Sequence, residues 1–263
     1  MHILKTEIGE HTAIVRTESE AIVAALNQMF EKCRADAESV LTADLVVDAE
    51  LGYGEPSPDY AVTITTEGST IIYNRLDYRI ETDASYRTAN IVAYNELSLK
   101  HAFMNLYCAY IVHIGWGLMI HSSCVIEDGQ AYLFAGQSGA GKSTVAKLSA
   151  PRPLLSDEAS LVKITPDGIL VYDSPFRSEL MSMYEGRICR LGGIHLLIQS
   201  SQVERKQIRS SEGIMHLLDK VFFWAHDAKE TSKVLGMLRE MVVTVPVYEL
   251  HFQKNNTFWE KIS

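Results

Sequence analysis

The order of apolar and polar positions divides the chain into an N-terminal part of short alternating stretches and a C-terminal part with longer apolar runs. Ala61 to Thr65 and Thr70 to Asn74 alternate as strands do, and the turn-rich stretch Gly52 to Pro58 precedes them. Ala21 to Cys33 has the periodicity of a helix. The pattern predicts a small α+β lobe over residues 1–97, in which no motif indicates chemistry.

Residues 98–263 are predicted to form a second domain of the α/β (α+β) class, built on a mixed sheet. Its first elements are a helix at Ser98 to Ile114 and strands at Leu118 to Ile126 and Ala131 to Ala135. The later elements are expected to be a helix at Ser143 to Leu148, a strand through Leu154-Leu155, a hairpin around Pro166-Asp167-Gly168, a strand at Ile194 to Ile198, a helix from about Ser211 to Ala225, a strand at Val245 to Phe252, and a helical turn near Thr257 to Ile262.

The longest apolar run, Ala102 to Ile120, approaches the roughly 20 residues that a membrane helix needs. Asn105, His113 and two glycines interrupt it. A buried helix followed by the start of a strand therefore explains the run better than a membrane segment.

The turn signal Asp128-Gly129 predicts a two-residue hairpin between the strands on either side of it. That register places Ile126 opposite Ala131 and His121 opposite Gly136. His121 is therefore expected beside the start of the segment that follows the second strand.

This following segment, GQSGAGKST, satisfies the phosphate-loop pattern GxxxxGK[ST] between an apolar strand and a helix. Its glycines allow backbone N–H groups to turn inward around an anion. Lys142 would reach the β and γ phosphates, and the hydroxyl of Ser143 would bind magnesium. The nucleotide-binding residues are predicted to be Gly136, Ser138, Gly139, Ala140, Gly141, Lys142, Ser143 and Thr144.

An acidic pair follows this loop closely, whereas the usual distant acid of phosphate-loop NTPases is missing. The apolar strand that would carry such an acid, Gly193 to Ile198, ends in Gln199-Ser200-Ser201. Asp157 and Glu158 instead come directly after the strand through Leu154-Leu155. If this strand runs parallel to Ala131–Ala135, Asp157 points towards the phosphates and can bind magnesium or accept a proton. A solvated acidic pair at a strand end is the alternative.

Three of these segments together resemble the HPr kinase/phosphorylase family, in particular its shorter HPr-kinase-like members, whose fold is similar to that of phosphoenolpyruvate carboxykinase. The matching segments are His121 to Val125, Gly136 to Thr144 and Leu154 to Glu158; Ser174-Pro175-Phe176-Arg177 and Val245 to Leu250 are also similar. The resemblance covers about residues 120–263. It implies a domain of the HPr kinase C-terminal type that binds nucleotide at the loop and uses Asp157 as general base towards a serine hydroxyl.

The leading hypothesis is a serine kinase that uses ATP and Mg²⁺ to phosphorylate a peptide or protein acceptor. Lys142 and Arg177 would stabilise the transferring phosphoryl group, although Arg177 could equally be a surface arginine. His121 would orient Asp157 or a water molecule, or would be structural. Ser143, Asp157 and Glu158 would hold the metal. A nucleotide-binding regulatory or scaffold protein without turnover, and a plain ATPase or GTPase, are the alternatives.

Composition limits the classes of partner and the cellular location that are expected for this protein. The net charge of −9 argues against a nucleic acid, because such partners require clustered Lys and Arg. The four cysteines lie far apart without metal-ligand spacing, and the polar N-terminus has no apolar signal region, so a cytoplasmic location with reduced thiols is expected. The acceptor, the nucleotide base and assembly into a homo-oligomer stay open.

Overall fold

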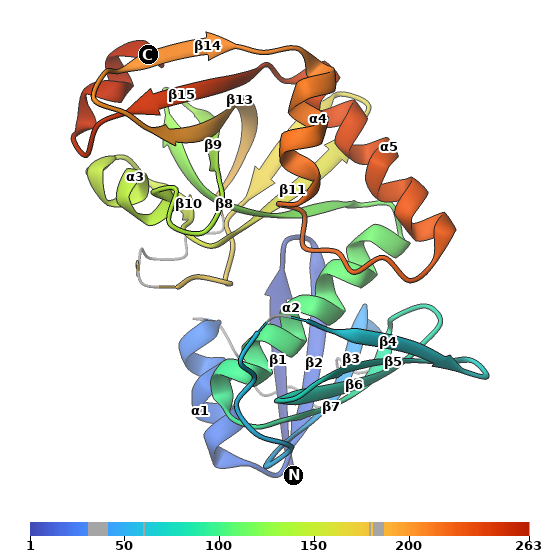
Figure 1. Cartoon of the computed structure of the whole chain (residues 1–263). Coiled ribbons are helices and arrows are strands. Elements are labelled where there is room, and N and C mark those ends of the chain that lie inside the picture. The colour runs from blue at the N-terminus through green and yellow to red at the C-terminus, as the bar shows by residue number, and fades with distance from the viewer. Residues whose placement is uncertain (31–41, 60, 179, 181–186, 263) are drawn as a thin grey trace. The chain divides into compact units, whose positions relative to one another are not determined.

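The computed structural model describes residues 1–30, 42–59, 61–178, 180 and 187–262, and its elements are labelled in Figure 1. The chain forms two compact units: Met1–Ile114 with Phe223–Glu230, and Gly115–Phe222 with Thr231–Ser263. The sequence-based boundary at 97/98 falls within the first turn of a long helix, Glu96–His113, which the structure groups with the first unit. The end of the predicted helix Ala21 to Cys33, from residue 31 on, lies outside the described residues.

The first unit is a mixed sheet with helices packed against it (Figure 1). Its strand order is β1-β2-β3-β7-β6-β5-β4, in which β2, β3 and β7 pair in parallel. The strands are β1 His2–Ile8, β2 His11–Thr17, β3 Leu45–Leu51, β4 Thr63–Glu67, β5 Thr70–Arg75, β6 Tyr78–Asp83 and β7 Thr88–Ala93. The helices are α1 Glu20–Met29 and α2 Glu96–His113. This unit therefore combines one mixed sheet with two helices among the described residues.

Helix α2 explains the longest apolar run of the chain. Its N-cap is Asn95, whose side chain accepts a 3.0 Å bond from the amide of Ser98. Nearly every later residue of the helix is buried, so the helix is apolar on all sides because it is enclosed by protein. None of the helices in the described ranges is long and apolar enough to cross a bilayer.

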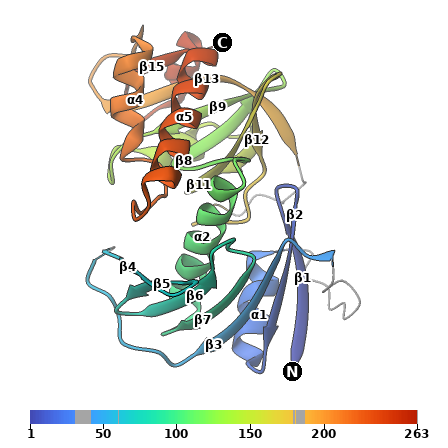
Figure 2. The same cartoon turned by 90° about the vertical axis from the view of Figure 1, so that its right-hand side faces the viewer.

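The second unit contains a mixed sheet in which five strands pair in a closed circuit, β8-β11-β12-β13-β9 and back to β8. Strands β15 and β14 extend the sheet from β13, and β10 pairs with β8 (Figure 1). Figure 2 shows β8, β9, β11, β12 and β13 from a second direction. The strands are β8 Gly117–Glu127, β9 Gln130–Ala135, β10 Leu154–Ser156, β11 Ala159–Thr165, β12 Gly168–Tyr172, β13 Ile188–Gln199, β14 Glu204–Gln207 and β15 Val247–Phe252. The helices are α3 Lys142–Leu148, α4 Ser210–Leu218, α5 Ala228–Thr244 and the 3-10 helix η2 Asn256–Lys261.

Most predicted elements of this unit are present, and the overall class is mixed α/β with two mixed sheets. The helix expected from about Ser211 to Ala225 ends at Leu218, and α5 follows it as a separate helix that the sequence pattern did not indicate. The residues beyond α4 turn extended, and Val221 forms a bridge with Ile120 of β8. Pairing with a strand edge therefore replaces the last turns of the predicted helix.

Candidate functional site

The hairpin of β8 and β9 fixes the position of His121. Asp128 and Gly129 have the positive φ angles of 49° and 75° that a two-residue turn of the primed type requires. Ile126 pairs with Ala131, and Ser122 pairs with Ala135, as the predicted register requires. His121 comes one residue before Ser122, and thus lies beside the point where the chain leaves β9.

The loop between β9 and α3 depends on its glycines. Gly139 and Gly141 have φ angles of 79° and 111°, which residues other than glycine rarely adopt. A Cβ atom at Gly136 would lie 2.6 Å from Cβ of Ala140, and one at Gly141 would lie 2.6 Å from Cζ of Phe252. The loop is therefore both tightly folded and packed directly against β15.

Lys142 stands at the start of α3 with its side chain folded back over the loop. It is 8% exposed, and its Nζ donates to the carbonyl oxygens of Gly136 at 3.0 Å and Gln137 at 3.1 Å. Burial lowers the pKa of the Lys142 ammonium, and the positive charge of Lys220 lowers it further. The carbonyl groups of Gly136 and Gln137 thus hold the ammonium group of Lys142 over the loop, within reach of an anion bound there.

Asp157 and Glu158 follow β10, which has the predicted direction. Both β9 and β10 run antiparallel to β8, so their C-terminal ends point the same way. Asp157 is 2% exposed. Its Oδ1 accepts a 3.0 Å bond from the amide of Ser178, and its Oδ2 accepts bonds from the hydroxyl of Ser178 at 3.0 Å and the amide of Leu180 at 2.9 Å.

A cavity of about 300 Å³ brings most of the predicted site residues together. Its lining combines an ammonium group, an imidazole, two carboxyl groups, hydroxyl groups and loop glycines. The lining residues are His121, Ser138, Gly139, Gly141, Lys142, Ser143, Thr144, Asp157, Glu158 and Ser178. Gly136 and Ala140 line a neighbouring cavity, and Arg177 lines neither.

His121 is neutral near pH 7 in this environment. Its ring lies 5.5 Å from that of Phe222, measured between ring centroids, and its amide donates a 2.7 Å bond to the carbonyl of Lys220. Burial lowers the pKa of His121 to about 4, assisted by the charges of Lys142 and Lys220 and opposed by Glu158. A neutral imidazole can accept or donate one hydrogen bond per ring nitrogen, which suits the orientation of a water molecule or a carboxylate.

Arg177 has a structural position. Its guanidinium forms a 2.5 Å ion pair with Asp173 and donates to the carbonyl of Leu154 at 3.1 Å. Its Nε also donates to the carbonyl oxygen of Ser174 at 3.0 Å. The side chain is 12% exposed. Arg177 therefore supports β10 through its bond to the carbonyl of Leu154.

Lys220 is a cation near the site that no sequence motif indicated. It is 7% exposed and forms a 2.5 Å ion pair with Asp219. The amide of Phe222 bonds to the carbonyl of Met119 at 2.9 Å, and this pairing with β8 brings Lys220 beside His121. Only the pairing of two segments distant in sequence could have revealed it.

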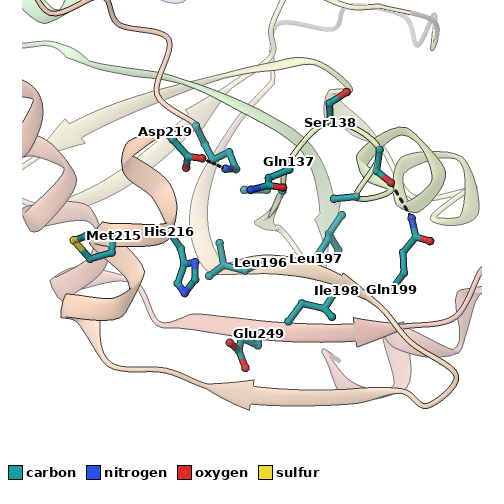
Figure 3. A pocket seen from close by; sticks show the side chains of 15 residues that line it. Gln137, Ser138, Leu196, Leu197, Ile198, Gln199, Met215, His216, Asp219 and Glu249 are labelled. Atoms are coloured by element: carbon teal, nitrogen blue, oxygen red, sulfur yellow. Dashed lines mark hydrogen bonds and ion pairs between the residues drawn. The ribbon is translucent and has the colours of Figure 1, made fainter.

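The second cavity, of about 510 Å³, shares Ser138 and Gly139 with the smaller cavity and is drawn in Figure 3. Leu196, Leu197 and Ile198 of β13 form one wall, and Met215 and His216 of α4 form another. Gln199 at the end of β13 donates a 2.8 Å bond from Nε2 to the carbonyl of Gly139 (Figure 3). Phosphate-loop NTPases usually carry an acid at the end of such a strand. In this protein the side-chain amide of Gln199 stands there and bonds to the loop.

The donor set of the smaller cavity fits a magnesium ion that is shared with phosphate. In the part of the chain that the structure describes, no three His, Cys, Asp or Glu side chains form a cluster able to hold a metal alone. Mg²⁺ usually takes one or two carboxylates and completes its shell with water and substrate phosphates. Asp157, Glu158 and the hydroxyl of Ser143 are suited to that role.

Fold and site together define a mixed α/β protein with a glycine-rich loop of the phosphate-binding sequence pattern, placed beside two carboxyl groups. The family model described as SynChlorMet cassette protein ScmC matches residues 88–263, more than half of the chain. The protein therefore belongs to the ScmC family. A comparison with curated proteins finds no match.

This family match corrects the assignment to the HPr kinase/phosphorylase family, which was wrong. The assignment rested on a few short segments around the loop and the acidic pair. A glycine-rich loop with a lysine, and an acid at a strand end, meet physical requirements common to many phosphate-binding proteins. Such segments indicate a kind of site and are weak guides to family membership.

Proposed function

We propose that this ScmC protein is a phosphotransferase of the P-loop type, which uses ATP and Mg²⁺ to phosphorylate a serine hydroxyl of a peptide or protein. The observation that carries the proposal is the joining of Lys142, Ser143, Asp157 and Glu158 in one cavity of about 300 Å³. Binding a polyphosphate and activating a hydroxyl require these groups within reach of each other.

In the proposed complex the loop amides and Lys142 hold the β and γ phosphates. The ammonium of Lys142 would exchange its bonds to the carbonyls of Gly136 and Gln137 for bonds to phosphate oxygens. Ser143 and the acidic pair would hold Mg²⁺, which would neutralise charge on the phosphates when bound. Lys220 would add positive potential from the side of His121.

Asp157 would act as the general base. Its carboxylate is a hydrogen-bond acceptor at the cavity wall, and it already accepts a hydrogen bond from the hydroxyl of a serine, Ser178. The same geometry would suit the hydroxyl of an acceptor peptide. His121, neutral near pH 7, would position Asp157 or a water molecule and would carry no charge itself.

A nucleotide-binding protein without turnover is the second candidate. It is favoured by the fact that both carboxylate oxygens of Asp157 already accept hydrogen bonds from Ser178 and Leu180. A bound acceptor would have to displace at least one of these donors. The cytoplasmic location and a homo-oligomeric state remain predictions.

Calorimetry with Mg·ATP and transfer of labelled phosphate to peptides encoded beside the gene test the proposal. Lys142→Ala should weaken ATP binding by about 10- to 100-fold, the value of a hydrogen bond between charged groups, and should suppress transfer as well. Lys147→Ala is the matched control, because Lys147 is an exposed lysine of the same helix α3. Equal ATP affinity in wild type and Lys142→Ala would refute the phosphate site.

A further inference from the structure

The hydroxyl of Ser178 lies where the proposed reaction needs an acceptor. It donates to Oδ2 of Asp157 at 3.0 Å, and Ser178 lines the same cavity as Lys142 and Ser143. Ser178 is an exposed residue at the wall of this cavity. The other serines packed around β8 and β10 are fully buried, namely Ser122, Ser123, Ser156 and Ser160.

A serine that donates to an aspartate is not unusual by itself, and the chain contains a second example. Ser85 in the first unit donates to Asp83 from its hydroxyl at 2.6 Å and from its amide at 2.7 Å. That pair forms a local turn between β6 and β7. What distinguishes Ser178 is its place in a cavity that also contains a glycine loop, a lysine and a second carboxyl group.

We propose that Ser178 is a site of intramolecular phosphorylation, and this inference rests on the proposed function. Ser178 Oγ attacks the γ phosphorus of bound ATP, the bond between that phosphorus and the β–γ bridging oxygen breaks, and ADP leaves. The hydroxyl proton passes to Asp157 and then to water. The products are phosphoserine at position 178 and ADP, so the atoms balance with ATP as the only co-substrate.

Phosphorylation of Ser178 can occur once per chain, because it consumes the hydroxyl group that reacts. The phosphoserine has a charge of about −1.5 to −2 at pH 7 and can no longer donate a hydroxyl proton to Asp157. Repulsion between the two anions breaks the hydroxyl contact between Ser178 and Asp157, so that Oδ2 of Asp157 keeps only the bond from the amide of Leu180. The first turnover therefore prepares the general base for an external acceptor.

Incubation of the full chain with Mg·ATP, followed by intact mass and fragment mass measurement, tests this proposal. One phosphoryl group is expected on Ser178, at a rate independent of protein concentration. Ser178→Ala should lose the label and Ser178→Thr should retain it, because threonine keeps a hydroxyl group. Ser85→Ala is the matched control and should be labelled as the wild type is.

The outcomes separate this inference from the proposed function. Transfer to an external peptide without label on Ser178 overturns the inference and leaves the function standing. Labelling that rises with protein concentration also overturns it, since the transfer is then intermolecular. If ATP affinity is equal in wild type and Lys142→Ala, and no label appears, both proposals fall.

Discussion

Two strands of the second unit end in a buried aspartate, and their surroundings differ. Asp157 follows β10 and lines the cavity that contains the loop. Asp173 follows β12, is 3% exposed and forms an ion pair with Arg177. The carboxylate of Asp173 is fixed by a guanidinium, whereas that of Asp157 faces a space in which a ligand can bind. Both aspartates are thus buried at the end of a strand. They differ because only Asp157 lines the cavity beside the loop.

Arg177 is thus bonded to the strands that carry the two aspartates. The sequence pattern around Arg177 indicated a cation for the phosphoryl group, but its bonds to Asp173 and to the carbonyl of Leu154 hold β10 in place. Replacing each aspartate in turn should therefore separate chemistry from stability.

The largest effect is expected for Asp157→Asn, which keeps the shape of the side chain and removes its charge. Loss of a general base should reduce phosphate transfer by about 10²- to 10⁴-fold, while ATP binding through the loop survives. Single-turnover transfer and calorimetry on the same sample measure both. A role confined to metal binding would appear as partial rescue by excess Mg²⁺ or Mn²⁺. Transfer at the wild-type rate would refute the role of Asp157 as base.

Arg177→Ala should act on stability. It leaves the buried carboxylate of Asp173 without its guanidinium partner, which costs about 3–5 kcal/mol of unfolding free energy for a buried pair. Denaturant unfolding measures this loss, and Asp173→Asn should show a similar one. The folded fraction of both variants should bind ATP with wild-type affinity. A stable Arg177→Ala protein with defective transfer would instead place Arg177 at the phosphoryl group.

His121→Gln should reduce transfer by about 10-fold, the value of roughly one hydrogen bond, and should change the acid stability. Burial lowers the folded-state pKa of His121 to about 4, below the ordinary value of 6.5, so the unfolded chain binds the proton first as the pH falls. Stability contributed by neutral His121 is therefore complete above pH 6.5 and is lost as the pH falls towards 4. Unfolding titrations over this range should show a shallower loss for the variant. An unchanged slope contradicts the lowered pKa.

The smallest effect is expected for Gln199→Ala, which removes one hydrogen bond to the carbonyl of Gly139. A partly exposed neutral bond contributes about 0.5–1.5 kcal/mol, so ATP affinity should fall only a few-fold. Met215→Ala, on the far wall of the same cavity, serves as the control and should bind ATP normally. A loss as large as that of Lys142→Ala would mean that the larger cavity holds part of the nucleotide.

The sequence predicted the parts of the site that depend on local geometry. The turn at Asp128-Gly129 determined the register, and the register placed His121. The glycine pattern indicated the loop, and the apolar stretch through Leu154-Leu155 indicated the strand before Asp157. Each of these rests on spacing within a short segment, where turn and strand geometry leave few alternatives.

Features that depend on distant segments were not predictable in this way. Lys220 reaches the site because the residues after α4 pair with β8. The ion pair of Arg177 with Asp173 and the closed circuit of strand pairings likewise depend on tertiary context. Helix α5, Ala228–Thr244, was also not predicted from the sequence.

The two-residue turn between β8 and β9 has a consequence for how this family can vary in length. Strand pairing counts in single residues, so one residue inserted at Asp128-Gly129 would shift every pair of the hairpin or force a bulge. His121 would then move along β8 relative to the start of the loop. Insertions should be absent from this turn among homologues that keep the histidine, whereas the turn of β11 and β12 at Pro166-Asp167 carries no such constraint. This two-residue turn thus sets the position of His121 along β8 relative to the loop.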